Sequence, residues 1–318
     1  MLMIGFLIQR LLVAIPTLLI ISVIVFCLQQ LLPGDPALVI GGGEATPAML
    51  AEIRERYGFN DPLIVQYWHW ITSVMHGDFG VSYRTREEIG PMLAAKIPVT
   101  LHLALAAMFI SLIIGIPAGI LAAIWRGRGW DHVVTITALS GISIPNFWLG
   151  IMMILVFAVN LGWLPASGYV SPFVDPWASL KSITMPAIVL GTALAAAMMR
   201  HTRSAMLTVM SQDYVRTARA KGQREWIVIL KHAFLNAQVP IITLATLQFG
   251  TLLAGAVLTE QIFSIPGIGK MVVDAVFNRE YQAVQAVTLL SGAAFVLMSL
   301  LADVLYFWAN PKLRSKTL

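Results

Sequence analysis

The sequence is poor in charge and has almost no cysteine. Only 12% of its 318 residues are charged, whereas a soluble domain carries about 25%. The low charge, together with 58% hydrophobic residues, excludes an ordinary soluble domain and indicates a membrane protein. The single cysteine, Cys27, lies in an apolar run and leaves no disulfide to build within the chain.

Catalytic and nucleotide-binding signatures are also missing. The sequence contains no HExxH, no GxSxG and no Cys-x-x-Cys motif. GIGK at 267–270 is the nearest match to a phosphate-binding loop, but Ser264 and Met271 stand where that loop needs a glycine and a Ser or Thr. The six histidines share no ligand spacing on one helix face. We therefore predict no enzyme activity, no metal site and no cofactor bound by this chain.

Six apolar runs are long enough to cross a hydrocarbon core of about 30 Å. They occupy residues 11–32, 99–124, 133–161, 185–205, 239–258 and 286–308. Pro117, Pro145 and Pro186 fall in or at the ends of these runs, so we expect bends there. The fourth helix is expected to continue past the membrane surface toward Met210. The sequence predicts an all-α membrane protein with six transmembrane helices.

The basic residues are concentrated in alternate connections. Segments 1–10, 125–132, 200–238 and 309–318 hold 13 Lys or Arg and 3 Asp or Glu, whereas 33–98, 162–184 and 259–285 hold 8 basic and 12 acidic residues. By the positive-inside rule the first set, with both termini, is cytoplasmic. The pI near 9.5 is therefore interpreted as a topological signal, and we predict no nucleic-acid partner.

One acid, Asp303, lies inside a span. It is within one or two turns of the cytoplasmic surface, where an acid pairs or extends toward the interface. A proton relay is the alternative, because intramembrane acids are often functional. No second acid or buried histidine nearby supports that alternative.

The long external segment, 33–98, predicts two amphipathic helices. The first begins at Thr46-Pro47 and ends before Gly58, with an apolar stripe at helical spacing: Met49, Leu50, Ile53 and Tyr57. The second begins at Asp61-Pro62 and ends at Gly77, with the stripe Leu63, Tyr67, Trp70, Ile71 and Val74. Packing against the membrane domain, or an interfacial belt, is the commoner role of such aromatic residues, and a ligand groove is the alternative.

The cytoplasmic segment 200–238 contains a short polar knob. Residues 213–220, DYVRTARA, are good helix formers opened by a helix-capping residue, and Gly222 ends that helix. A second helix, from Glu225 to about Gln238, runs into the fifth span. Anchoring at anionic lipid is one role for the basic side chains here, worth about 1 kcal/mol each. These side chains are Arg216, Arg219, Lys221 and Arg224.

RTARAKG at 216–222, KHAFLNA at 231–237 and Pro240 resemble the cytoplasmic EAA loop of ABC importer permeases, in the form used by the dipeptide, oligopeptide, glutathione and nickel group. Arg216 and Thr217 replace the first two letters of the general pattern, whereas Ala218 and Gly222 match it. His232 stands where that pattern has isoleucine, and Leu235 where the group often has arginine. The resemblance extends along most of the chain: LLPGDPA at 31–37, HGDFGVS at 76–82, GISIP at 141–145, MPAIVLG at 185–191, TRSAML at 202–207 and GTLLAGAVLTEQIFSIPGIG at 250–269.

The resemblance implies one permease of an ATP-driven type I importer in a bacterial inner membrane, carrying short peptides or related small solutes. It implies a first helix with an external subdomain at 1–94, a type I transmembrane domain at 95–308 and a basic tail at 309–318. The implied partners are membrane lipid, a second related permease, an external substrate-binding protein and two ATPases that bind ATP and Mg. An ion-gradient-driven secondary transporter is the alternative, although the sequence lacks the inverted repeats and paired midplane acids typical of one.

The resemblance also assigns the candidate site residues. The ATPase-coupling loop would comprise Asp213, Arg216, Thr217, Ala218, Arg219, Ala220, Lys221, Gly222, His232 and Asn236. The small residues Ala218 and Gly222 would allow a close approach of the partner's backbone. Asn146, Thr246 and Gln248 are candidates for the translocation path, although hydrogen bonds between helices, worth about 0.6 kcal/mol, are the commoner role.

Overall fold

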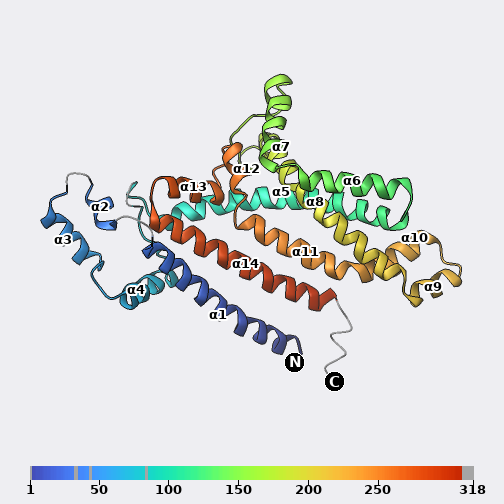
Figure 1. The fold of residues 1–318 in the computed structure, drawn as a ribbon, viewed down its shortest axis with the longest axis horizontal. Helices are drawn as coiled ribbons and strands as arrows, with labels where there is room; N and C mark the ends of the chain where they lie inside the picture. The colour runs from blue at the N-terminus through green and yellow to red at the C-terminus, as the bar shows by residue number, and fades with distance from the viewer. Residues whose placement is uncertain (1, 32–34, 43–44, 83–84, 310–318) are drawn as a thin grey trace.

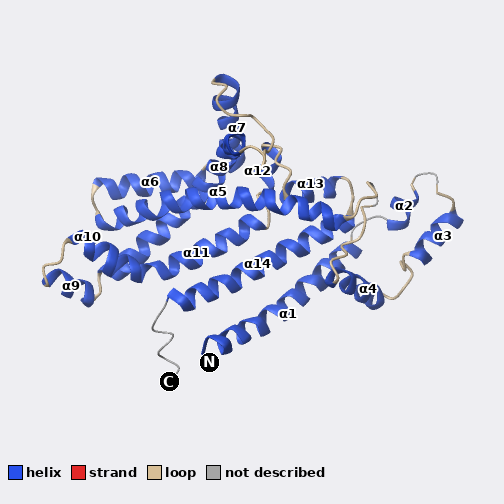
Figure 2. Cartoon of the chain, turned by 180° about the vertical axis from the view of Figure 1, so that it is seen from behind, coloured by secondary structure: helices blue, strands red, loops and turns tan. Residues whose placement is uncertain are grey.

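The computed structural model describes residues 2–31, 35–42, 45–82 and 85–309. Within these ranges the chain is helical apart from loops and one isolated antiparallel bridge, Val81 to Glu88 (Figure 2). The helices of the first half are α1 Leu2–Gln30, α2 Pro36–Gly41, α3 Pro47–Arg56, α4 Leu63–Met75, α5 Ile89–Ile124, α6 Gly129–Ser143, α7 Asn146–Met153 and the π-helix η1 Ile154–Asn160. Those of the second half are α8 Pro176–Met210, α9 Asp213–Ala220, α10 Glu225–Ile227, the π-helix η2 Val228–Phe234, α11 Leu235–Leu253, α12 Val257–Ile262, α13 Ile268–Phe277 and α14 Tyr281–Ala309.

Among the described residues, five helical segments are long and apolar enough to cross a membrane. They are Ile8–Gln30 in α1, α5, α8, the continuous run Glu225–Leu253 and Tyr281–Trp308 in α14. Each coincides with a predicted span, and α8 continues to Met210 as expected. The chain is therefore an all-α membrane protein, with its long helices running side by side (Figure 1).

The third predicted span, 133–161, is not one helix. α6 ends at Ser143, Ile144 is extended, and α7 starts after Pro145. Proline has no backbone N–H and disfavours the helical conformation in the residue before it, which explains the break. α6 packs along α8, whereas α7 and η1 project away from the bundle (Figures 1 and 2). The predicted bend at Pro145 is thus a complete interruption, while α5 and α8 continue through Pro117 and Pro186.

The core of the bundle is the pair α5 and α8, which approach closely at glycines. A Cβ on Gly115 would lie 2.9 Å from the carbonyl oxygen of Ala195, and one on Gly119 would lie 2.6 Å from that of Met199. These distances are below any real Cβ contact, so only glycine permits the approach of the two backbones. Gly115 and Gly119 form a GxxxG pair, in which small residues four positions apart let two membrane helices pack closely.

α1 packs mainly on α14, at the edge of the bundle. Arg10 of α1 and Asp303 of α14 form an ion pair at 3.0 Å. Further along the same contact, a Cβ on Gly292 would lie 3.0 Å from Ile21. The interpretation of Asp303 as a paired acid is confirmed, and the pair fixes α1 lengthwise on α14.

The two predicted external helices are α3 and α4. Thr46 caps α3 through its Oγ1, which accepts from the amide of Met49 at 3.3 Å. Gly58 and Gly77, at φ +65° and +83°, follow the two helices in the left-handed conformation that glycine favours. Tyr67 and Trp70 of the predicted stripe pack on Phe26 of α1, and Tyr67 hydrogen-bonds Ser22 at 2.8 Å, whereas Leu63 is exposed. This confirms the packing role predicted for its aromatic residues.

Candidate functional site

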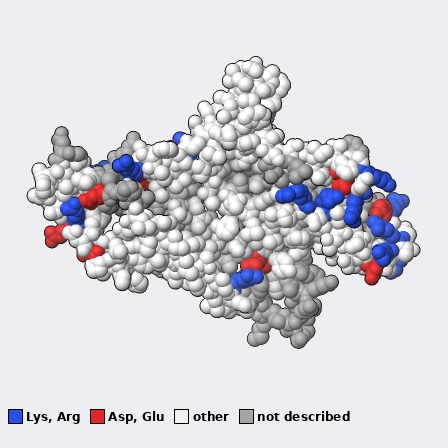
Figure 3. Space-filling model, viewed as in Figure 1, with Lys and Arg blue, Asp and Glu red and all other residues white. Residues whose placement is uncertain are grey.

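Lysine and arginine side chains gather at one end of the molecule, over α9, α10 and the neighbouring helix ends, whereas acidic and basic side chains mix at the opposite end (Figure 3). α9 and α10 form the knob predicted from the sequence. Gly222 joins them at φ +72°, and a Cβ there would meet nothing within 4 Å. Asp213 is the first residue of α9 rather than its cap, because Gln212 occupies the cap position, where its side chain does not cap the helix.

α9 is held by a small apolar contact with the return helix. Val215 and Ala218 are buried and pack with Val228 of η2. Ala218 is only 5% exposed, so its side chain lies against the return helix rather than at the surface of the knob. Its small side chain allows α9 to lie close to its own return helix. The knob is therefore a compact unit built by the chain itself.

The outer face of α9 carries the charge. Asp213, Arg216, Thr217, Ala220 and Lys221 are exposed. Arg216 lies 3.6 Å from Asp213, a surface pair that contributes little to stability. Lys221 has no ion pair with any residue that the structure describes. Two basic side chains thus extend toward solvent at the tip of the knob.

Arg219 has a different role within the loop. Its guanidinium binds the carboxylate of Glu225 through three hydrogen bonds, the shortest at 2.8 Å. This pairing raises the pKa of Arg219 further above its usual range. Because Glu225 is the first residue of α10, the pair connects α9 to α10 across Gly222.

His232 and Asn236 lie on the helical run that returns from the loop. The Nε2 of His232 lies 2.7 Å from Oε1 of Gln223, and the amide of Asn236 donates to the carbonyl of His232 at 2.8 Å. An amide oxygen only accepts, so Nε2 is the protonated nitrogen of this histidine. His232 thus connects the return helix to the turn after Gly222, whereas Asn236 is exposed and its hydrogen bond stays within its own helix.

The three path candidates lie in two places. Thr246 and Gln248 are buried on α11, and Asn146 is half-buried at the start of α7. The Oγ1 of Thr246 donates to the carbonyl of Ile242 at 2.9 Å, and the Gln248 amide points at the carbonyl of Leu194 in α8 at 3.5 Å. Neither hydrogen bond involves Asn146, so no shared polar site is formed by the three. In the described ranges, no group of three or more acidic, histidine or cysteine side chains is placed to hold a metal ion.

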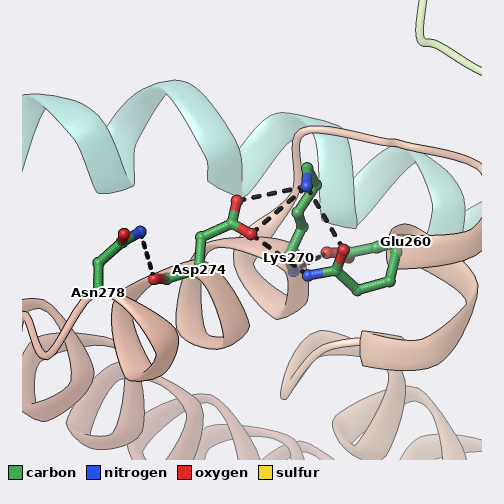
Figure 4. Close-up of polar contacts among 5 residues, drawn as sticks. Glu260, Lys270, Asp274 and Asn278 are labelled. Atoms are coloured by element: carbon green, nitrogen blue, oxygen red, sulfur yellow. Dashed lines mark hydrogen bonds and ion pairs between the residues drawn. The ribbon is translucent and has the colours of Figure 1, made fainter.

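A buried acid that the sequence analysis passed over lies at the other end of the bundle. Glu260 of α12 is fully buried. Its Oε1 accepts from the hydroxyl of Thr100 in α5 at 2.9 Å, and its Oε2 accepts from the amide of Lys270 at 2.8 Å. Thr100 Oγ1 accepts in turn from the amide of Ile268 at 2.8 Å. One carboxylate thus joins α5, α12 and the first turn of α13. Figure 4 shows Glu260 of α12 beside Lys270 of α13.

The environment of Glu260 combines burial with several donors. Burial raises the pKa of its carboxyl, although the amides of Lys270 and Gly269 and the Thr100 hydroxyl act in the opposite direction. The free amides and dipole at the start of α13 favour negative charge there. Glycine is required around the carboxylate, since a Cβ on Gly267 would lie 2.5 Å from it.

A second buried acid stabilises the end of the bundle that carries the knob. Asp131, at the start of α6, is 5% exposed and accepts from Nε and Nη2 of Arg203 in α8, both at 2.8 Å. The hydrogen bonds from Arg203, and one from the amide of Gly127, lower the pKa of Asp131 to about 2. Asp131 therefore stays charged at physiological pH and ties the turn between α5 and α6 to α8.

Comparison with known proteins agrees with this architecture. The family described as binding-protein-dependent transport system inner membrane component matches residues 115–315, and its N-terminal counterpart matches residues 3–104. The chain is 44% identical to the glutathione transport system permease protein GsiC of Salmonella choleraesuis, over 99% of this chain and 100% of that protein. It is also 44% identical to GsiC of Escherichia coli K12, with the same coverage.

Solved structures show the same fold. An inward-facing form of the MetNI methionine ABC transporter matches with a TM-score of 0.53 and 19% identity, covering 71% of this chain and 97% of that one. A second crystal form of MetNI matches with a TM-score of 0.51. The fold is therefore that of a type I importer permease.

The family match and these relatives define the class of protein. It is a membrane permease of an ABC importer, a transport subunit rather than an enzyme. The chain belongs to the family of binding-protein-dependent transport system inner membrane components, in the peptide and glutathione group. It is a multi-pass inner membrane protein that works with a substrate-binding protein and an ATPase. An ion-gradient-driven carrier finds no support among these relatives.

Proposed function

We propose that this permease carries short peptides, with glutathione among them, and that it pairs with a second homologous permease and two ATPases. The 44% identity to a glutathione permease over nearly the whole chain is the observation that carries the proposal. This chain supplies the path and a mechanical connection, and the ATPases bind ATP and Mg. Lipid contacts the exposed apolar faces of α1 and α14.

The knob formed by α9 and α10 is proposed to dock in a groove of an ATPase and to transmit its motion to α8 and α11. The exposed Arg216 and Lys221 support this role, as does the internal pairing of Arg219 with Glu225. A rigid knob is needed because a flexible loop would absorb the movement instead of passing it to the bundle. His232 and Asn236 are proposed to support the loop from the helical run that follows α10.

Transport should require every proposed component. In liposomes containing both permeases, both ATPases and the binding protein, we expect labelled glutathione and tripeptides to accumulate with ATP hydrolysis. Omission of the ATPases should reduce accumulation to background, because the sequence of this chain has no nucleotide-binding motif and no paired midplane acids. Accumulation without ATPases, driven by a proton or sodium gradient, would refute the proposal. Accumulation of neither peptide by the complete system would refute the substrate class.

The proposed orientation places both termini and the knob in the cytoplasm. With the exposed Cys27 replaced, a cysteine at Gln223 should resist an impermeant thiol reagent in intact cells, while one at Ser171 should be labelled. The expectation rests on the excess of basic residues around α9. The two cysteines serve as controls for each other, and rapid labelling at Gln223 from outside would reverse the orientation.

A further inference from the structure

A cavity of about 860 Å³ lies at the end of the molecule opposite the knob. Its walls come from the ends of α1, α3 and α14, from α4, from the connection between α3 and α4, and from residues 78–82 and Arg86, which follow α4. Six of the lining residues represent these elements: Gln30, Arg56, Asp61, Trp70, Tyr281 and Gln285. Its size is within the range of about 300–1,000 Å³ found for small-molecule sites.

A buried, unpaired donor lines this cavity. Gln285 of α14 is only 4% exposed, and its Nε2 has no hydrogen-bond partner among the described residues. A buried amide without a partner costs about 1–3 kcal/mol. An oxygen acceptor on a ligand, such as a carbonyl or carboxylate, would satisfy this group. Without a bound ligand, the cavity therefore leaves this amide donor without an acceptor.

Unpaired charges of both signs lie at the end of α3 and on the connection that follows it. Neither the guanidinium of Arg56 nor the carboxylate of Asp61 forms an ion pair with any residue that the structure describes. Arg54 and Asp35, which also line the cavity, neutralise each other. The two free groups complement a ligand that carries both a carboxylate and an ammonium.

Aromatic rings form one part of the wall, beside polar residues of α1, α4 and the segment 78–82. Tyr57 and Phe59 stack with ring centroids 5.8 Å apart, and Trp70 packs beside Phe26 at 5.9 Å. Aromatic rings provide apolar surface for side chains at low entropic cost. The cavity thus offers an amide donor, two charges of opposite sign that form no ion pair, and aromatic surface. Together these groups match a short peptide with free termini.

We propose that this cavity is an external acceptor site for a short zwitterionic peptide on its way from the binding protein to the translocation path. Gln285 donates to a peptide oxygen, Arg56 binds the carboxylate and Asp61 binds the ammonium. The proposal rests on the substrate class proposed above. It makes the external subdomain a ligand-binding element as well as a packing element.

The test is equilibrium binding of labelled trialanine to the complete transporter in nanodiscs, without binding protein or ATP. The wild type should bind free trialanine about 10-fold more tightly than N-acetyl-trialanine amide, because blocking removes both charges. Gln285→Leu should weaken binding by about 10-fold. Glu52→Ala, an exposed change in α3 away from the cavity, is the matched control and should bind as the wild type does.

Equal binding of the free and blocked peptides, or equal binding by wild type and Gln285→Leu, would overturn the proposal. The comparison of peptides needs no variant, so a folding defect in Gln285→Leu leaves the test intact. If the complete liposome system accumulates trialanine while the nanodiscs bind none, the acceptor site is rejected and the proposed function stands. If neither assay responds, the peptide substrate class fails as well.

Discussion

Gly222→Trp is expected to abolish ATP-driven uptake and release the ATPases, while the permease remains in the membrane. Gly222 lies at φ +72°, and a Cβ at this position would have nothing within 4 Å, so an indole would project outward into the space proposed for the partner. The left-handed conformation adds a cost of about 1–2 kcal/mol in the permease itself. Copurification of ATPases with a tagged permease, measured beside peptide uptake, gives the result.

Gly77→Trp is the matched control for this variant. Gly77 lies at φ +83°, also with nothing within 4 Å of a Cβ, but in the external subdomain at the other end of the molecule. Its backbone strain is comparable, so it should retain its ATPases. Loss of ATPases in both variants would point to general misfolding, and retention in both would reject the coupling role of the α9 knob.

Gly267→Ala is expected to destabilise the transporter and to reduce uptake strongly. The added methyl would lie 2.5 Å from the Glu260 carboxylate, which is itself held by Thr100 and Lys270 and cannot move freely. Overpacking of this kind costs about 1–3 kcal/mol. Thermal unfolding of the purified complex should show a lower midpoint, and transport assays should show the loss of uptake.

A double-mutant cycle with Glu260→Ala separates the clash from other effects. Removal of the carboxylate makes room for the methyl, so the two substitutions should be strongly non-additive. Gly129→Ala is the control, because a Cβ at that helical glycine meets nothing within 4 Å. Additive effects of Gly267→Ala and Glu260→Ala would show that the carboxylate does not determine the need for glycine.

Much of the fold could be predicted because its signals are local. The lengths of the apolar runs define five of the spans, and capping residues with glycines define α3, α4 and α9. Gly115 and Gly119 indicate close packing because small residues four apart lie on one helix face. The fate of Pro145 was harder to predict, since a proline in an apolar run produces either a bend or a break according to its tertiary contacts.

The parts of the site that were missed depend on contacts between distant segments. Glu260 is separated from Thr100 by 160 positions, and Asp131 from Arg203 by 72. A single acid followed by the glycine-rich stretch PGIG was a local signal for Glu260, but nothing near it in sequence identifies its partners. The packing of Ala218 was missed for a related reason, because its neighbour, Val228, lies beyond the turn at Gly222.

The packing of α1 on α14 has a consequence for biogenesis. α1 leaves the ribosome long before α14, which is its principal helical neighbour and to which it is fixed by Arg10 and Asp303 and by the close approach at Gly292. Until α14 has been synthesised, α1 must remain in the bilayer with most of its surface against lipid and its arginine unpaired with Asp303. The contact between α1 and α14 therefore forms only after all the helices between them have been made.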